Sequence, residues 1–386
     1  MLGLFSNFAN LFGFLGVGLC LLLSVAPPAF AQVSPETRIF PALKLEYLDR
    51  QVIGKSLTDN SFQNTVVGGL SAITYDRQED CYYALSDDRS NRAPARFYTL
   101  KLATEQTGQD IAIANLEITN VTFLQDTNGQ PYEAGTIDGE GIALSPRRTL
   151  FISSEGNPSK NIAPFIGEFD LATGKKILDI PLPKRYLAEA SSETGIRENL
   201  AFESLTVNQT GLLKDDPFRL FTATESSLRQ DVTEDPSARL RFLHYVINPF
   251  GSPILVAEHL YPLEPAGMET ISNGLTEIYA LKREGYFLSL ERTFGFTGAG
   301  AKIFQVVVGD ATDTSTYKNL QETSQIRPLK KKLLLDLADL GIYLDNLEGM
   351  TVGGMLPDGS RSLILISDNN FNEEQVSQIL LFRLRE

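Results

Sequence analysis

The stretch DGEGIALSPRRTLFISSEG, residues 138–156, decides the fold. Its two halves, GEGIAL and LFISSEG, are rich in apolar residues and are joined by a polar turn, which is typical of a β-hairpin. Glu140 lies near the start of the first half, and Glu155 lies near the end of the second. Because a hairpin brings these two ends together, the stretch predicts two strands with carboxylates meeting at one edge.

Both halves of this hairpin recur along the chain at intervals of about 70 residues, which indicates an internal repeat. The first half recurs as GLSAITY (69–75), GEGIAL (139–144), FESLTV (202–207), GLTEIYAL (274–281) and LEGMTV (347–352). The second half recurs as YYALSDD (82–88), LFISSEG (150–156), LFTATES (220–226), YFLSLER (286–292) and LILISDNN (363–370). Further strand-like segments follow, such as residues 165–170 and 176–180, so each unit is expected to hold four strands.

Five such units predict an all-β fold: a single β-propeller with five four-stranded blades. The last unit has only three obvious strands, whereas residues 43–53 form a strand-like segment without a unit. We expect this segment to pair beside residues 378–384 and close the ring, because an open edge would leave backbone groups unpaired. Six blades are the alternative, if residues 183–200 or 310–332 contain further strands.

The first thirty-one residues resemble an export signal. Residues 11–26 are almost wholly apolar, and Ala29-Phe30-Ala31 matches a signal peptidase site. We therefore expect a signal peptide over residues 1–31, a propeller domain over residues 32–386, and a periplasmic or extracellular location. No Lys or Arg precedes the apolar run, so an uncleaved anchor is the alternative. No second segment is long enough to span a bilayer.

Composition excludes several classes of function. A net charge of −14 argues against nucleic acid or anionic lipid as a partner. The only histidines, His244 and His259, lie in strand-like segments and are expected to be structural, so a histidine-rich metal site is excluded. The RHGxRxP motif of histidine acid phosphatases is absent, and so is the GxSxG motif of hydrolases with a nucleophile elbow, which argues against both classes. Cys81 is the only cysteine outside the predicted signal peptide, and we expect a buried thiol.

The acids of the repeat are expected to surround one mouth of the propeller channel. In each blade the start of the first strand lies beside the end of the second, which places both sets of acids on one face. These acids are Asp87, Asp88, Asp138, Glu140, Glu155, Glu203, Glu225, Glu277, Glu291, Glu348 and Asp368. Carboxylates at such density repel one another unless they bind protons or a cation. The alternative is that each acid caps a turn or pairs with a neighbouring basic residue.

Oxygen ligands in this number fit calcium better than magnesium, so calcium is the expected cofactor. The expected calcium ligands are Asp87, Asp138, Glu140, Glu203, Glu277, Glu348 and Asp368. Glu155, Glu225 or Glu291 is expected to act as general base, and Arg89 or Arg292 to hold an anionic oxygen of the substrate. Ser71 stands where the other units have Glu, which predicts four carboxylates at that level. The lysines at residues 330–332 are expected to be solvated.

Several strings together resemble the phytase-like esterase family of exported bacterial proteins. They are GGLSAITYD, LSDDR, DGEGIAL, SSEG, FESLTV, TES, LER, NLEGMTVGG and SDNNF, which lie in this order from residue 68 to the C-terminus. The resemblance implies a propeller that hydrolyses phosphate or other esters, but it transfers no catalytic role to a particular residue.

Resemblance and acid pattern together predict a calcium-dependent hydrolase of phosphate monoesters or related esters. Its partner would be a small-molecule substrate, and a monomer is expected. One alternative is a calcium-dependent lactonase. The other is a non-catalytic binding propeller in which calcium is structural.

Overall fold

The structure is a computed structural model that describes residues 39–53, 61–187, 192–234, 237–265, 267–296, 298–321 and 324–385. The predicted signal peptide, residues 1–31, lies outside the described residues. In the part of the chain that is described, no helix has both the length and the apolar character needed to cross a bilayer.

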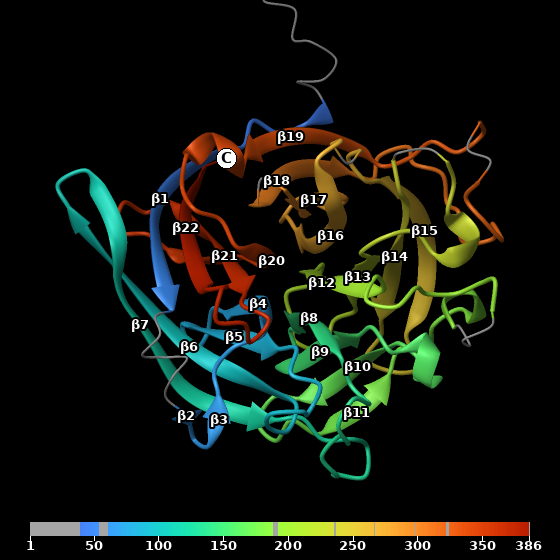
Figure 1. Cartoon of the computed structure of the whole chain (residues 1–386), viewed down its shortest axis with the longest axis horizontal. Coiled ribbons are helices and arrows are strands. Elements are labelled where there is room, and N and C mark those ends of the chain that lie inside the picture. The colour runs from blue at the N-terminus through green and yellow to red at the C-terminus, as the bar shows by residue number, and fades with distance from the viewer. Residues whose placement is uncertain are drawn as a thin grey trace, which may run out of the picture.

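Five four-stranded antiparallel sheets form a ring of blades (Figure 1). Blade 1 contains β4 (Leu70–Asp76), β5 (Cys81–Ser86), β6 (Arg96–Thr107) and β7 (Asp110–Phe123). Blade 2 contains β8 (Gly139–Leu144), β9 (Thr149–Ser154), β10 (Phe165–Asp170) and β11 (Lys176–Asp179). Blade 3 contains β12 (Phe202–Gln209), β13 (Phe218–Thr224), β14 (Arg239–Ile247) and β15 (Ile254–Pro262).

Blades 4 and 5 complete the ring. Blade 4 contains β16 (Thr270–Ala280), β17 (Tyr286–Gly295), β18 (Gly298–Val307) and β19 (Lys330–Asp336). Blade 5 contains β20 (Asn346–Met355), β21 (Arg361–Asp368), β22 (Ser377–Arg385) and the N-terminal strand β1 (Lys44–Ile53). Among the described residues, the remaining elements are the small hairpin of β2 (Ser61–Phe62) and β3 (Thr65–Val66), and 3-10 helices at Pro158–Lys160, Lys184–Tyr186, Arg229–Asp231 and Leu337–Leu340.

The ring closes as the sequence predicts. Strand β1 pairs antiparallel with β22, so that Lys44 lies opposite Arg385 and Ile53 lies opposite Ser377. Within its described residues, segment 183–200 contains a 3-10 helix, and segment 310–332 contains no strand before Lys330. The fold is therefore a propeller of five blades, and the six-blade alternative is wrong.

Apolar contacts between neighbouring blades build the core. The second strand of each blade is buried on both faces, because both faces of an inner sheet meet an adjacent blade. Leu288 and Leu290 of β17 pack in one cluster with Leu363 and Leu365 of β21, for example. Burial of each such side chain stabilises the fold by about 1.5–3 kcal/mol. Cys81 is also buried, as predicted, at the start of β5.

Strands β4, β8, β12, β16 and β20 lie around the centre of the ring (Figure 1). Each of them carries a β-bulge, near its start in β4, β8, β12 and β20 and in the middle of the longer β16, where the register against the second strand of the blade shifts. At this bulge one residue of the first strand has no partner in the second strand, except in β8, where two residues have none. The residue without a partner, or the first of the two in β8, is Ser71, Glu140, Glu203, Thr276 or Glu348. Because a bulge re-aims a side chain away from the regular ladder, the five bulges define one ring of positions, which we call the bulge ring.

Candidate functional site

A second ring of positions lies beside the bulge ring. The second strand of each blade pairs with the start of the first through Ser86, Ser154, Thr224, Glu291 or Ser367. The residue that follows in the chain is Asp87, Glu155, Glu225, Arg292 or Asp368. We call these five positions the strand-end ring. Four of them carry a carboxylate, and blade 4 supplies a guanidinium group instead.

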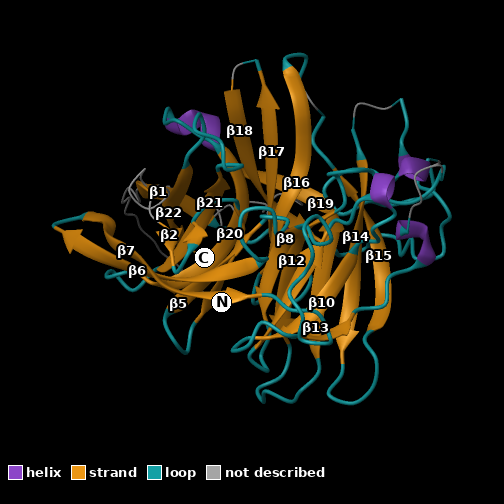
Figure 2. Cartoon of the chain, turned by 60° about the horizontal axis from the view of Figure 1, so that its bottom comes forward, coloured by secondary structure: helices purple, strands orange, loops and turns teal. Residues whose placement is uncertain are grey.

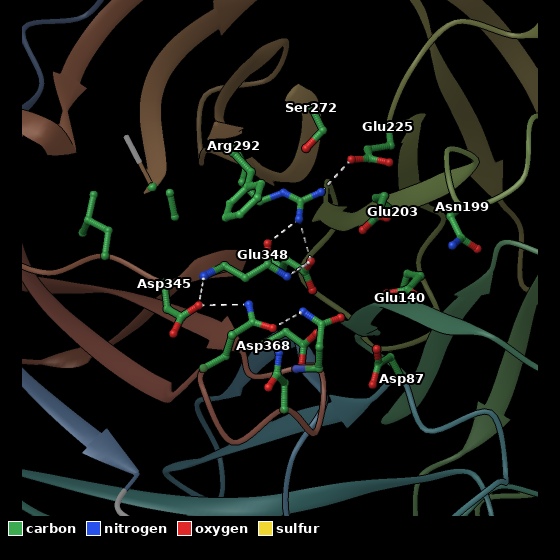
Figure 3. A pocket seen from close by; sticks show the side chains of 18 of the residues that line it. Asp87, Glu140, Asn199, Glu203, Glu225, Ser272, Arg292, Asp345, Glu348 and Asp368 are labelled. Carbon is green, nitrogen blue, oxygen red and sulfur yellow. Dashed lines mark hydrogen bonds and ion pairs between the residues drawn. The ribbon is translucent and has the colours of Figure 1, made fainter. Parts of the chain in front are cut away.

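Both rings open into a cavity of about 740 Å³ at one mouth of the channel (Figure 3). Among the described residues, nine acids line it: Asp87, Glu140, Glu155, Glu203, Glu225, Asp345, Glu348, Asp368 and Glu374. Seven of the nine belong to the two rings. Arg89 and Arg292 are the cationic residues of this lining. The site therefore has a large excess of negative charge in a largely buried setting.

Burial and mutual repulsion make these carboxylates hard to ionise. Burial, followed by the charge of Asp368, raises the pKa of Glu348 to about 8. Burial also raises the pKa of Asp368 to about 6. The pKa values of Glu140 and Glu203 lie well above their ordinary range, because both are buried and face further carboxylates. A bound cation would offset this repulsion and favour the charged forms.

Arg292 crosses the acidic mouth between two blades. Its Nη2 donates to Glu225 Oε1 at 2.9 Å, and its Nη1 donates to Glu348 Oε1 at 3.3 Å and to Asn346 (Figure 3). Gly274 makes room for this arrangement, since a Cβ there would lie 2.1 Å from Glu225 Oε1. Arg292 lowers the pKa of Glu225 against the larger effect of burial, so Glu225 holds a charge more easily than it would alone.

Arg89, three residues after the end of β5, also lines the acidic cavity. Its Nε donates to Asp138 Oδ1 at 2.6 Å, and its Nη2 donates to Asn199 Oδ1 at 3.1 Å. Asn199 lines the same cavity. The two guanidinium groups expected to face the substrate thus both line the cavity. Arg292 is held by two carboxylates and an amide, and Arg89 by one carboxylate and an amide.

The carboxylates also fit a cation by geometry. One oxygen from each of Asp138, Glu140 and Glu155 lies within 4.8 Å of the other two, and the same holds for Glu155, Glu203 and Glu225. Glu155 belongs to both groups, so the two candidate sites adjoin. Asp87 Oδ1 is buried without a hydrogen-bond partner in the described structure, which leaves an oxygen ready to coordinate a cation.

The other wall of the cavity is apolar. Phe294, Ala299, Ile342 and Leu344 line it together with the half-exposed ring of Tyr343. Phe294 lies near the tip of the β17–β18 hairpin, and Figure 2 shows β16, β17 and β18 extending beyond the other strands. The cavity thus combines an acidic floor with an apolar side.

The phytase-like family, described as "Esterase-like activity of phytase", matches residues 65–371. The chain belongs to this family. The match spans all five of the paired first and second strands described above, and therefore both rings of the phytase-like site.

Solved structures resemble this phytase-like chain only in a general way. The PQQ-bound aldose sugar dehydrogenase of Streptomyces coelicolor is 10% identical, with 90% of this chain and 100% of that chain covered and a TM-score of 0.38. The catalytic domain of the Coprinopsis cinerea GH62 α-L-arabinofuranosidase is 11% identical, with coverages of 81% and 91% and a TM-score of 0.34. The Nup133 β-propeller domain of Vanderwaltozyma polyspora is 10% identical, with coverages of 88% and 97% and a TM-score of 0.32. No match was found among curated proteins.

Glu277 of the phytase-like chain does not lie in the bulge ring, contrary to the sequence-based expectation. Thr276 occupies the ring position of blade 4, and Glu277 lies one residue further along β16. Its carboxylate accepts hydrogen bonds from the backbone N–H groups of Leu205 at 3.1 Å and Ile278 at 2.9 Å. Glu277 therefore joins the inner strands of blades 3 and 4 inside the channel, and it does not line the acidic cavity.

Glu291 is likewise one residue short of the strand-end ring, which Arg292 occupies. Its Oε1 accepts from Tyr261 and from Lys331 Nζ, each at 2.5 Å. Lys331 is largely buried and lies over the rings of Tyr261 and Phe304, so the prediction of a solvated lysine run is wrong at this residue. Glu291 does not line the acidic cavity, which removes it as a candidate base.

Hydrophobic alternation in the first strands could have corrected the placement of Glu277. Two residues after each bulge position lies a buried, large apolar side chain, at Ile73, Ile142, Leu205, Ile278 and Met350. Counting back two residues from each gives Ser71, Glu140, Glu203, Thr276 and Glu348, which is the bulge ring. The expected four carboxylates at this level are therefore three, with two hydroxyl groups.

Asp88 has a structural role. It forms a buried ion pair with Arg96 at 2.7 Å and accepts backbone hydrogen bonds from Asn91, Arg92 and Ala93. The turn-capping alternative thus holds for this acid.

Proposed function

We propose that the chain is a calcium-dependent hydrolase of phosphate monoesters or related esters, acting in the acidic cavity. The observation that carries the proposal is the convergence of seven ring carboxylates and Arg292 on one cavity. The family description, which names an esterase-like activity of phytase, supports the same reaction class.

Calcium is the cation that suits these residues. The candidate ligands are oxygens, and the two adjoining groups around Glu155 supply several carboxylates each. Calcium accepts six to eight oxygen ligands in flexible geometry, whereas magnesium prefers few carboxylates and retains water. We expect Glu140, Glu155, Glu203 and Asp138 to be ligands, with Asp87, Glu348 and Asp368 on the other side of the mouth.

Calcium in this cavity would polarise the ester oxygen and lower the pKa of a bound water. The chain itself must then accept a proton and hold the substrate. Glu225 is our candidate base, because its ion pair with Arg292 opposes the effect of burial on its pKa. Glu155 is the second candidate, but its position between both ligand groups fits coordination better. Arg292 and Arg89 would hold an anionic oxygen of the substrate.

The apolar wall suits the organic part of an ester. Phe294, Ile342 and Leu344 face the same cavity as the carboxylates, so a substrate could contact them while its ester group meets the acidic floor. This feature is compatible with a lactone as well, which keeps the lactonase as a second candidate. A binding propeller with structural calcium would use the same ligands.

Ester hydrolysis with and without chelator separates these functions. The purified protein would be incubated with 4-nitrophenyl phosphate, inositol hexakisphosphate, a carboxylic ester and a γ-lactone, with calcium or with excess EGTA. Calcium-dependent release from a phosphate ester supports the proposal, and release from the lactone alone supports the lactonase. No hydrolysis of any substrate by calcium-loaded protein would leave the binding propeller.

We also propose that the chain is exported after cleavage behind Ala31, because residues 1–31 have the features of a signal peptide. The test is the N-terminal sequence and location of the protein expressed in a bacterial host. A periplasmic or secreted protein that starts at Gln32 is expected, and a full-length membrane-bound protein would contradict it.

A further inference from the structure

The channel has a second mouth, with a character opposite to that of the acidic one. The first strand of each blade begins at the acidic mouth, so its far end marks the other side of the molecule. In β12, Val207 lies four residues beyond Glu203, which is roughly 13 Å along a strand at about 3.3 Å per residue. Val207, Tyr279 and Val352 line a cavity of about 710 Å³ at this end.

An adjoining cavity of about 260 Å³ extends into the channel. The two cavities share the lining residues Val207, Tyr279, Lys282, Val352 and Arg361. Together they have the size and the apolar walls of a small-molecule site, with a few polar groups that converge on it.

Every charged residue that lines the larger cavity is basic: Lys282, Arg361 and Arg385. Arg77 joins them in the smaller cavity, where the one acid of the described lining is Glu277. The carboxylate of Glu277 is buried and already accepts the backbone N–H groups of Leu205 and Ile278. In a chain of net charge −14, this concentration of positive charge is unusual.

The nearby described acids have partners other than Lys282 and Arg361. Asp80 accepts the Tyr75 hydroxyl at 2.7 Å, and Glu284 pairs with Arg219 at 2.7 Å. Asp358 pairs with Arg383 at 2.8 Å and lies 3.9 Å from Arg385. No ion pair within the described structure neutralises Lys282 or Arg361, and Arg361 is only half exposed. A partly desolvated guanidinium group without a carboxylate partner is suited to bind an external anion.

We propose that this second mouth binds a small organic anion, with its carboxylate or phosphate group at Arg361 and Lys282. Its apolar body would lie against Val207, Leu281 and Val352. The site is independent of the proposed hydrolysis, because it lies at the opposite end of the channel and shares no lining residue with the acidic cavity.

The test is calorimetric titration with 1-naphthoate, using protein stripped of divalent cations on a chelating resin. Two further probes separate charge from shape: 1-naphthalenemethanol keeps the rings without the charge, and inorganic phosphate keeps the charge without the rings. We expect saturable binding of 1-naphthoate, and binding of the other two that is at least about tenfold weaker.

Arg361→Gln and Lys282→Gln should each weaken 1-naphthoate binding about tenfold, because each removes one charge-assisted contact. Lys175→Gln is the matched control, since Lys175 is an exposed cation on the β10–β11 turn outside both cavities and should leave binding unchanged. Melting curves check that the variants fold. Lys282 is exposed, so Lys282→Gln carries the test if the half-buried Arg361 proves necessary for folding.

Three results would overturn the proposal. The first is the absence of saturable 1-naphthoate binding up to millimolar concentration. The second is equal affinity for 1-naphthalenemethanol, which would mean that the cations do not take part. The third is wild-type affinity in both Arg361→Gln and Lys282→Gln.

Discussion

Blades 3 and 4 have the same two ring positions but fill them with different chemistry. Blade 3 contributes Glu203 from its bulge and Glu225 from its strand end. Blade 4 contributes Thr276 and Arg292 at the equivalent positions. Arg292 pairs with Glu225 of blade 3 and with Glu348 of blade 5, so the divergent blade connects its two neighbours. The repeat therefore determines the position of a side chain, whereas its charge differs from blade to blade.

The largest effect on turnover is expected from substitutions near the end of the second strand in blades 3 and 4. Glu225→Gln removes the proposed base and should lower turnover by roughly two to four orders of magnitude while calcium still binds. Glu291→Gln, the matched change in blade 4, lies outside the cavity and should leave turnover of the folded protein near wild type. Steady-state kinetics of both variants at saturating calcium measure this. Equal losses in the two variants would remove the assigned difference between the blades.

Removing calcium with a chelator tests whether the acidic blades need a cation for stability in addition to the guanidinium group of blade 4. Calcium that binds the folded state alone stabilises it by about 2.7 kcal/mol at a hundredfold excess over its Kd. The melting temperature should therefore fall by several degrees in excess EGTA. The measurement is a thermal melt by circular dichroism with calcium, with EGTA, and with EGTA followed by calcium. An unchanged melt would mean that the rings hold no calcium.

A smaller effect is expected at the start of the first strands. Glu203→Gln removes one ligand charge from the bulge ring and should weaken calcium binding about tenfold, with activity restored by added calcium. Glu277→Gln is the control in blade 4, because Glu277 contacts backbone N–H groups in the channel and not the cavity. Calcium titration calorimetry compares the two. Weaker calcium binding in Glu277→Gln than in Glu203→Gln would contradict the assignment of the ring.

The smallest effect is expected in the pH dependence of the calcium-free protein. Folding raises the pKa of Glu348 to about 8 and of Asp368 to about 6, so the folded state binds more protons than the unfolded state above their ordinary pKa values. Stability should thus be greatest near pH 4 and fall as pH rises through 6 and 8.

Arg292→Gln should steepen this decline, because Arg292 lowers the pKa values of Glu225, Glu348 and Asp368. Urea unfolding at several pH values in EGTA measures the slope. A calcium-free protein that gains stability between pH 5 and 8 would contradict the sign.

Sequence alone was sufficient for the blade count and the closing strand, because both follow from periodicity and from the cost of an open edge. It also brought most of the acidic residues to the right mouth. It failed in blade 4, where aligning acids by type placed Glu277 and Glu291 one position away from the rings. A β-bulge shifts side-chain direction by one residue, so residue type is a poor guide to register there.

Side-chain positions that the repeat does not specify could not be predicted from the sequence. Nothing in its pattern indicates that Lys331 turns inward to Glu291, since a run of three lysines is usually solvated. The apolar wall was also missed, because Phe294 of β17 and Ile342 of a loop both lie outside the repeated strings.

The seam between β1 and β22 has a consequence for the order of folding. Residues 44 and 385 meet there, whereas the strands of blades 1 to 4 pair with near neighbours in the chain. Such a contact has a high entropic cost of loop closure, so this pairing is expected to be the slow, late step. Until it forms, one edge of β22 remains open to strands from other chains. Competition between correct folding and aggregation is therefore expected to be decided where the two ends of the polypeptide pair.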